Sequence, residues 1–257
     1  MSSIPAPFSQ ACENNREPIL KILKQAFSGC RRVLEIGSGT GQHSVYFAPQ
    51  LPHLVWQCSD QPQYLDGIRA WHAKLPASNL AEVITLEVCS PWPQSATEPA
   101  PDAIYSANTA HIMSQPMVEA MFTGIGKVLQ SGGRFCLYGP FNYRGDYSSD
   151  SNRVFDAMLR QRDPQSGIRD QEWILMLAAA QGLELCQDHA RQQPPAGVYS
   201  QNGSLTEKKV TRKGNEKKSR DKFTRKSHEP IVVIKSSEQK VAGKISVLPE
   251  SPGAICL

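Results

Sequence analysis

Short apolar segments alternate with longer stretches of helical spacing over the first 140 residues of this chain. The five apolar segments are residues 33–36, 54–60, 83–88, 102–108 and 134–138. Strand-sized apolar runs separated by helical stretches predict an α/β fold, with a doubly wound, mostly parallel sheet and helices on both faces. Ligands of such sheets bind beyond the carboxyl ends of the strands. Six polar side chains fall at or near those ends: Glu35, Asp60, Glu87, Asn108, His111 and Tyr138.

A glycine-rich turn follows the first segment, in the run Glu35-Ile36-Gly37-Ser38-Gly39-Thr40-Gly41. A turn of this kind between a strand and a helix lets a ligand approach bare backbone. The dinucleotide fingerprint G-x-G-x-x-G would need a third glycine where this chain has Gln42. Glu35 also adds negative charge beside the turn, which favours a cationic or zwitterionic ligand over a pyrophosphate. S-adenosylmethionine, with its sulfonium and ammonium groups, is such a ligand.

The acidic residue followed by G-x-G-x-G resembles the first motif of class I S-adenosylmethionine-dependent methyltransferases. The resemblance implies that Gly37, Gly39 and Gly41 pack against the cofactor, and that Glu35 helps to hold its amino-acid end.

Three further residues complete the candidate cofactor site. Asp60 lies about 20 residues past the glycine turn, where a doubly wound fold places its ribose-binding acid. The alternative is that Asp60 caps the next helix. Glu87 stands where the family usually has an aspartate near the adenine, and Asn108 ends the fourth strand.

Several segments outside the turn narrow the resemblance. They are residues 11–20, 138–141, 151–160, 162–164 and 167–170, together with Gly41-Gln42-His43 and residues 108–112. With them, residues 10–190 are similar to the methyltransferase-like 26 family, whose function is uncharacterised. The resemblance implies a Rossmann-like sheet of seven strands. Its closing strand is in question here, because Arg191-Gln192-Gln193-Pro194-Pro195 replaces the family's usual continuation, and prolines disfavour strands.

The segment 151–160 allows two interpretations. Asn152, Asp156 and Arg160 recur at i, i+4 and i+8 on one helix face. Asp156 and Arg160 form either a local ion pair or part of a polar lid above the cofactor. Helical spacing places three apolar side chains toward the core: Phe155, Met158 and Leu159.

His111 is the candidate acid–base residue, since an unperturbed imidazole accepts a proton near neutral pH. The alternative is a structural histidine at the rim of the pocket. Tyr138 and Arg16 are the other candidates on the substrate side, with Arg16 closing the cofactor pocket. The alternative for Arg16 is a surface residue of an N-terminal helix. The run Asn108-Thr109-Ala110-His111 lacks the N/D-P-P-Y/F motif of many amino-methyltransferases. This difference favours a small-molecule acceptor with a carboxyl or hydroxyl group.

Charge divides the chain at about residue 190. Residues 1–190 carry a net charge of −4, whereas residues 191–257 carry +8. We therefore expect a methyltransferase domain over 1–190 and a basic, poorly ordered tail over 191–257. The tail could bind RNA or another polyanion, or remain solvated without a partner. Two strand-like runs in the tail, 231–234 and 244–248, predict low order or weak pairing with a sheet edge, unless one of them supplies the closing strand.

Composition limits the remaining classes. The seven cysteines form no C-x-x-C pair, which argues against a zinc site and a disulfide framework. No apolar run has the ~18 residues of a membrane span, and the N-terminus lacks the pattern of a signal peptide. We expect a cytoplasmic methyltransferase with a small-molecule acceptor. The alternatives are a methyltransferase-like binding module that contacts polyanions and a nicotinamide-dependent oxidoreductase, which Gln42 disfavours.

Overall fold

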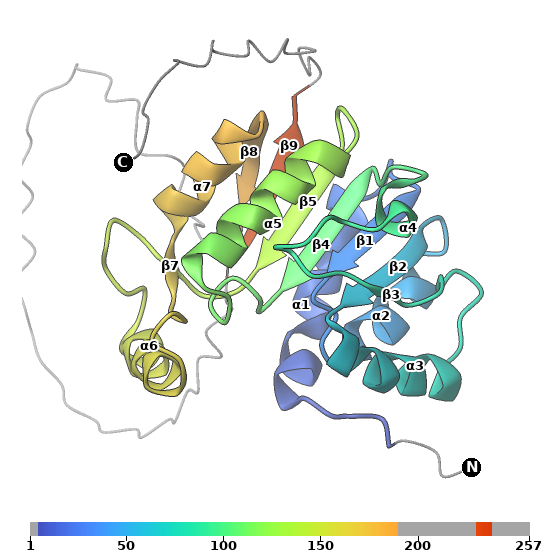
Figure 1. The fold of residues 1–257 in the computed structure, drawn as a ribbon, viewed down its shortest axis with the longest axis horizontal. Helices are drawn as coiled ribbons and strands as arrows, with labels where there is room; N and C mark the ends of the chain where they lie inside the picture. Colours follow the sequence, from blue (N-terminus) through green and yellow to red (C-terminus); the bar gives the residue numbers. More distant parts are fainter. Residues whose placement is uncertain (1–4, 190–229, 238–257) are drawn as a thin grey trace, which may run out of the picture.

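A computed structural model describes residues 5–189 and 230–237. Its centre is a seven-stranded sheet of order β3-β2-β1-β4-β5-β9-β8 (Figure 1). The strands are β1 (Arg32–Ile36), β2 (Val55–Asp60), β3 (Ile84–Thr85), β4 (Ala103–Ala107), β5 (Arg134–Tyr138), β8 (Leu183–Asp188) and β9 (Ile231–Ser236). Strands β1 to β5 pair in parallel, and β9 is antiparallel to both neighbours. This arrangement confirms the predicted mostly parallel α/β fold.

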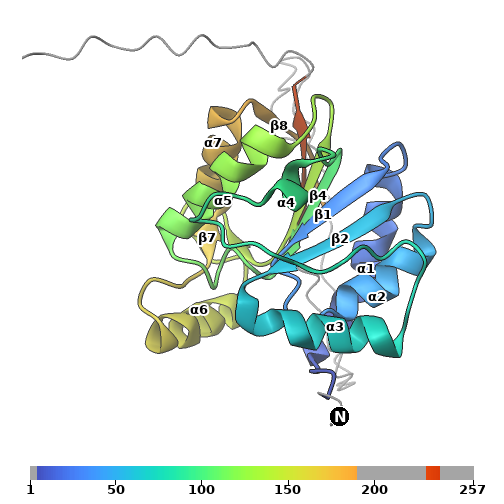
Figure 2. The ribbon, with the colours of Figure 1, turned by 45° about the vertical axis from the view of Figure 1, so that its right-hand side comes forward.

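Helices cover both faces of the sheet (Figures 1 and 2). The helices are α1 (Gln10–Ala26), α2 (Gln42–Phe47), α3 (Leu65–Lys74), α4 (Gln94–Thr97), α5 (Gln115–Val128), α6 (Asp150–Arg162) and α7 (Gln171–Ala180). Helices α1 to α3 share one apolar cluster with the sheet, and α5 and α7 share the other. Successive side chains of β1 face opposite sides of the sheet, and both sides are buried: Val33 belongs to the first cluster and Leu34 to the second. The strands are therefore continuous apolar runs in the sequence.

The closing strand comes from the expected tail. β9 lies between β5 and β8, with Cys136 opposite Val233, and the side chains of residues 231–234 are at most 3% exposed. Ile231 and Val233 pack into one apolar cluster, whereas Val232 and Ile234 pack into the other. The expectation of low order or weak edge pairing for this run is therefore corrected. The sheet of the first domain includes residues beyond the expected boundary at 190.

Smaller differences concern the third strand and the tail. The third strand spans only Ile84–Thr85, so Glu87 lies beyond it. A two-stranded sheet, β6 (Phe141–Asn142) with β7 (Arg169–Asp170), follows β5.

The basic run, residues 208–226, and the second strand-like run, 244–248, lie outside the described residues. Within the described part of the chain, none of the helices has both the length and the hydropathy that a membrane crossing requires.

Candidate functional site

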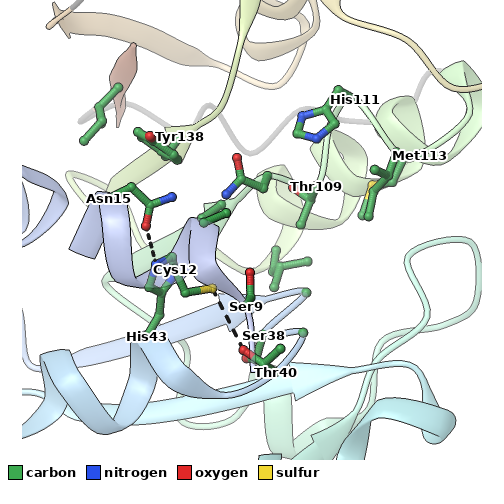
Figure 3. Close-up of a pocket in the computed structure, with 18 of the residues that line it drawn as sticks. Ser9, Cys12, Asn15, Ser38, Thr40, His43, Thr109, His111, Met113 and Tyr138 are labelled. Carbon is green, nitrogen blue, oxygen red and sulfur yellow. Dashed lines mark hydrogen bonds between the residues drawn. The ribbon is translucent and has the colours of Figure 1, made fainter. Parts of the chain in front are cut away.

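A cavity of about 1410 Å³ lies at the carboxyl ends of the strands. Figure 3 shows that α1, the glycine turn and the segment after β4 contribute to its wall. Of the predicted site residues, seven line it: Gly37, Gly39, Asp60, Asn108, His111, Tyr138 and Asn152. Pockets for a single drug-sized ligand usually measure about 300–1,000 Å³. The cavity therefore has room for two ligands side by side.

The three glycines of the turn have different structural roles. All three have positive φ angles, of 72°, 57° and 84°. A Cβ atom on Gly37 would lie 2.6 Å from Cγ2 of Thr109, and one on Gly41 would lie 2.9 Å from Cα of Ile68 in α3. A Cβ atom on Gly39 would meet nothing within 4 Å. Gly41 thus allows close helix packing outside the cavity lining, whereas Gly39 leaves open space at the cavity wall.

Asp60 is buried beside this open space. Its Oδ2 accepts a hydrogen bond of 2.6 Å from the amide of Gly39, and its Oδ1 accepts one of 2.7 Å from Gln61. Burial raises the pKa of the Asp60 carboxyl, and the two amide donors oppose that shift. The following 3₁₀ helix has Gln61 as its N-cap, so the structure does not support the capping alternative. Each carboxylate oxygen has a further lone pair for a ligand hydroxyl.

Glu35 and Glu87 do not belong to the cavity lining. The Oε2 atom of Glu35 accepts a hydrogen bond of 2.8 Å from Nε1 of Trp56 and one of 3.4 Å from Sγ of Cys58. Burial raises the pKa of the Glu35 carboxyl. Glu87 is exposed and accepts a hydrogen bond from Ser90. Strand alternation turns Glu35 into the core and β3 ends before Glu87, so neither carboxylate lines the cavity, and their contacts with a cofactor stay predictions.

Helix α1 and its N-cap residue supply lining residues that the sequence analysis did not identify. Ser9, Cys12 and Asn15 line the cavity (Figure 3). Gln42, at the position of the missing third glycine, connects α1 to the turn: its Oε1 accepts a 2.5 Å hydrogen bond from the amide of Ser9, and its Nε2 donates to Glu13 at 2.9 Å. The segment 11–20, noted in the sequence, contains Cys12 and Asn15, but only Arg16 of this segment was predicted to belong to the site.

Arg16 lies away from the cavity. Its guanidinium pairs with Glu13 at 2.6 Å and stacks over the ring of Tyr46, with 4.4 Å from Cζ to the centroid. The interpretation of Arg16 as a pocket residue is therefore corrected in favour of a surface residue of α1.

His43 is a second histidine in the wall that the sequence analysis did not select. Its Nε2 lies 2.8 Å from Oδ1 of Asn15, and its Nδ1 lies 3.3 Å from the hydroxyl of Tyr105. Because the Asn15 oxygen can only accept, Nε2 carries the proton and Nδ1 accepts from Tyr105. Burial lowers the pKa of His43 to about 4.

His111 lines the opposite side of the cavity (Figure 3). Its side chain is 5% exposed, and its Nδ1 has no hydrogen-bond partner among the described residues. The imidazole contacts the ring of Phe155 edge-on, with 5.3 Å between centroids. Burial lowers the pKa of His111 to about 4, and the positive charge of Arg169 contributes. The imidazole is therefore neutral at pH 7.

Asp156 and Arg160 form an ion pair rather than a lid above the cavity. Asp156 is 2% exposed and accepts hydrogen bonds from Arg160 Nε at 2.8 Å, the Tyr147 hydroxyl at 2.7 Å and the Ile168 amide at 2.6 Å. Neither residue lines the main cavity. Asn152, one turn before Asp156 in α6, and half-buried Phe155 line it, and Leu159 is buried. Met158 is 51% exposed, which corrects its predicted burial.

The segment after Asp156 holds the backbone around His111. The Gly167 amide donates to the His111 carbonyl at 2.9 Å, and the Ser166 hydroxyl donates to the Ile112 carbonyl at 3.1 Å. Arg169 is buried, and its guanidinium donates to the carbonyls of Ala110, Met113 and Gln165. The segments 151–160 and 167–170, noted from the sequence, thus act together: α6 anchors residue 168, and residues 166–169 hold the loop that carries His111.

Solved structures of similar fold include several methyltransferases. The O-methyltransferase family 2 protein from Planctomyces limnophilus DSM 3776, in complex with apigenin, has a TM-score of 0.64 at 12% identity, over 88% of this chain and 57% of that protein. Mitomycin 7-O-methyltransferase MmcR has a TM-score of 0.63 at 14% identity, over 88% of this chain and 54% of MmcR. PigF with SAH has a TM-score of 0.60 at 14% identity, over 86% and 54%.

This chain spans little more than half the length of these three proteins. At such low identity the similarity establishes a methyltransferase-like fold. The family described as "Protein of unknown function (DUF938)" matches residues 6–195, which covers most of the chain and the whole range of the expected resemblance. The chain therefore belongs to the DUF938 family.

Proposed function

We propose that this protein is an S-adenosylmethionine-dependent methyltransferase that acts on a small molecule. The observation that carries the proposal is the open space at Gly39, bordered by the buried carboxylate of Asp60. A side chain at position 39 would occupy this space, so the bare backbone leaves room for a ligand. Relatives of similar fold, among them PigF with SAH, support the choice of cofactor.

The lining residues fit the parts of this cofactor. The backbone of Gly37–Thr40 would lie against it, and Asp60 would accept hydrogen bonds from the two ribose hydroxyl groups. Leu86 and Val88, near β3, offer apolar surface for the adenine. When bound, the cofactor supplies a methyl group activated by a sulfonium charge.

The remaining part of the cavity would hold the acceptor. His111 and Tyr138 line it beyond β4 and β5, and Asn152 reaches it from α6. Holding donor and acceptor in line converts a bimolecular reaction into an effectively unimolecular one, which supplies a large part of the acceleration. The size of the cavity, about 1410 Å³, supports a small acceptor bound beside the cofactor.

Titration with S-adenosylhomocysteine by calorimetry tests the proposal. We compare the wild type with Gly39→Ala and Gly132→Ala. Both glycines have positive φ, 57° and 75°, and neither would bring a Cβ atom within 4 Å of another residue. Both variants should therefore lose a similar ~1–2 kcal/mol of stability through backbone strain. Only Gly39 lines the cavity, so only Gly39→Ala should weaken binding, by at least about tenfold or ~1.4 kcal/mol.

Gly132 precedes β5 and lies outside the cavity lining, so it is the matched control. Lack of wild-type binding at hundreds of micromolar S-adenosylhomocysteine would refute the proposal. Equal affinity in the two variants would refute the assignment of Gly39.

A further inference from the structure

The part of the cavity beyond β4 and β5 combines apolar surface with polar groups that carry no permanent charge. Its apolar and aromatic lining residues are Met113, Met117, Tyr138, Phe155 and Ile231, and its polar ones include Asn108, His111 and Asn152. Among the described residues that line the whole cavity, the only Asp, Glu, Lys or Arg side chains are Asp60, on the side of the glycine turn, and exposed Lys21 of α1. A permanently charged acceptor placed near Met113 and Phe155 would lose hydration and gain no opposite charge in return.

His111 is one of these polar groups. Its Nδ1 is buried without a partner among the described residues. A Cβ atom built onto Gly139 would lie 3.6 Å from this nitrogen and 3.9 Å from the Asn108 amide nitrogen, both ordinary contact distances, so a methyl-sized group fits beside the nitrogen. A buried polar atom without a hydrogen bond is unfavourable. A ligand hydroxyl that reaches this space would satisfy it.

The local electrostatics distinguish a hydroxyl from an amine. The pKa of His111, lowered to about 4 by burial and by Arg169, shows that this place disfavours positive charge. Methylation of an amine leaves a cationic nitrogen in this place, whereas methylation of a hydroxyl group leaves an uncharged ether once its proton has left. The neutral imidazole accepts the hydroxyl proton as the bond to the methyl carbon forms and releases it to water, so no positive charge remains beside Arg169.

Building on the proposed function, we propose that the acceptor is an uncharged, largely apolar molecule that presents a phenol- or enol-type hydroxyl group to Nδ1 of His111. The acceptor oxygen forms a bond to the methyl carbon as the carbon–sulfur bond breaks, and that electron pair stays on sulfur. The hydroxyl proton passes to His111 and then to water. The products are a methyl ether, an uncharged thioether and one proton. A weakly basic imidazole suffices, because the oxygen becomes strongly acidic as its new bond forms.

Binding of model acceptors to the protein saturated with S-adenosylhomocysteine tests this assignment without a turnover assay. The probes are 1-naphthol, naphthalene, 1-naphthoate and 1-naphthylmethylammonium, titrated by calorimetry. We expect 1-naphthol to bind at least tenfold more tightly than each of the others. His111→Phe keeps an aromatic ring beside Phe155 and removes the nitrogen, so this variant should bind 1-naphthol and naphthalene with about equal affinity. His53→Phe, at an exposed histidine outside the cavity lining, is the matched control and should keep the preference.

The outcomes separate this inference from the proposed function. Normal binding of S-adenosylhomocysteine with equal or tighter binding of the naphthoate or the ammonium probe overturns the acceptor class alone. The same conclusion follows if none of the four probes binds, or if His111→Phe keeps the preference for the hydroxyl. Absence of S-adenosylhomocysteine binding overturns the cofactor proposal, and the acceptor class with it.

Discussion

Acid destabilisation of the wall around His43 gives a quantitative test of the structure. His43 is 5% exposed, and its two ring nitrogens are engaged by Asn15 and Tyr105. Burial lowers the pKa of His43 in the folded state to about 4, against about 6.5 in the unfolded chain. Protonation of Nδ1 would also remove the acceptor of the Tyr105 hydrogen bond. His43→Gln removes this titration.

The sign and size follow from proton linkage. Between pH 6.5 and 4 the unfolded chain binds the proton and the folded protein does not, so stability is complete above this range and falls as the pH decreases through it. The shift in the pKa of His43 corresponds to about 3 kcal/mol over the full range, of which about 2 kcal/mol is lost between pH 7 and pH 5. The variant lacks this loss.

Urea unfolding, followed by tryptophan fluorescence at pH 7 and pH 5, measures the effect. We expect the stability difference between the wild type and His43→Gln to shift by about 2 kcal/mol in favour of the variant at pH 5. Carboxyl groups such as Glu35 titrate in both proteins and cancel in the comparison. His53→Gln, at an exposed position, should leave the difference unchanged. A difference for His43→Gln that is the same at both pH values contradicts the structural account of this residue.

Two further predictions concern α1 and α6. Cys12 lines the cavity beside Thr40, so bound S-adenosylhomocysteine should slow the alkylation of Cys12 by a maleimide at least about tenfold. Peptide mass spectrometry measures the rate, and exposed Cys89 is the internal control. Equal slowing at both cysteines, or no slowing at Cys12, would contradict the proposed site. Asp156→Ala leaves the Ile168 amide without its acceptor, whereas half-exposed Arg160 can turn to water, so the free energy of unfolding should fall by about 1–3 kcal/mol. A loss below ~0.5 kcal/mol in urea unfolding would show that Asp156 does not anchor this segment.

Local patterns in the sequence predicted the part of the site that depends on local structure. The glycine spacing and the acid after the second strand predicted where Gly39 and Asp60 lie, because parallel strands bring their carboxyl ends to one edge. The same reasoning did not predict that Glu35 is buried in the core and absent from the cavity lining. Whether the last residues of a strand face a ligand or the core depends on their partners, and for Glu35 the partner is Trp56 in the neighbouring strand.

Features that depend on distant residues were not predictable from local patterns. Arg16 could face the pocket or Tyr46, and only the packing of α1 against α2 decides. The burial of residues 231–234 depends on pairing between Cys136 and Val233, which lie far apart in the chain. An apolar run of four residues carries no information about which strand it joins.

The burial of β9 also bears on the entropy cost of the long connection between β8 and β9. About forty residues separate Asp188, the end of β8, from Ile231, the start of β9. Compared with a hairpin loop of about five residues, three doublings of loop length add roughly 2 kcal/mol of closure entropy. Each of the four buried side chains of residues 231–234 recovers about 1.5–3 kcal/mol. The hairpin can therefore tolerate large changes in the length of its connection, while Ile231 keeps its place in the wall of the cavity.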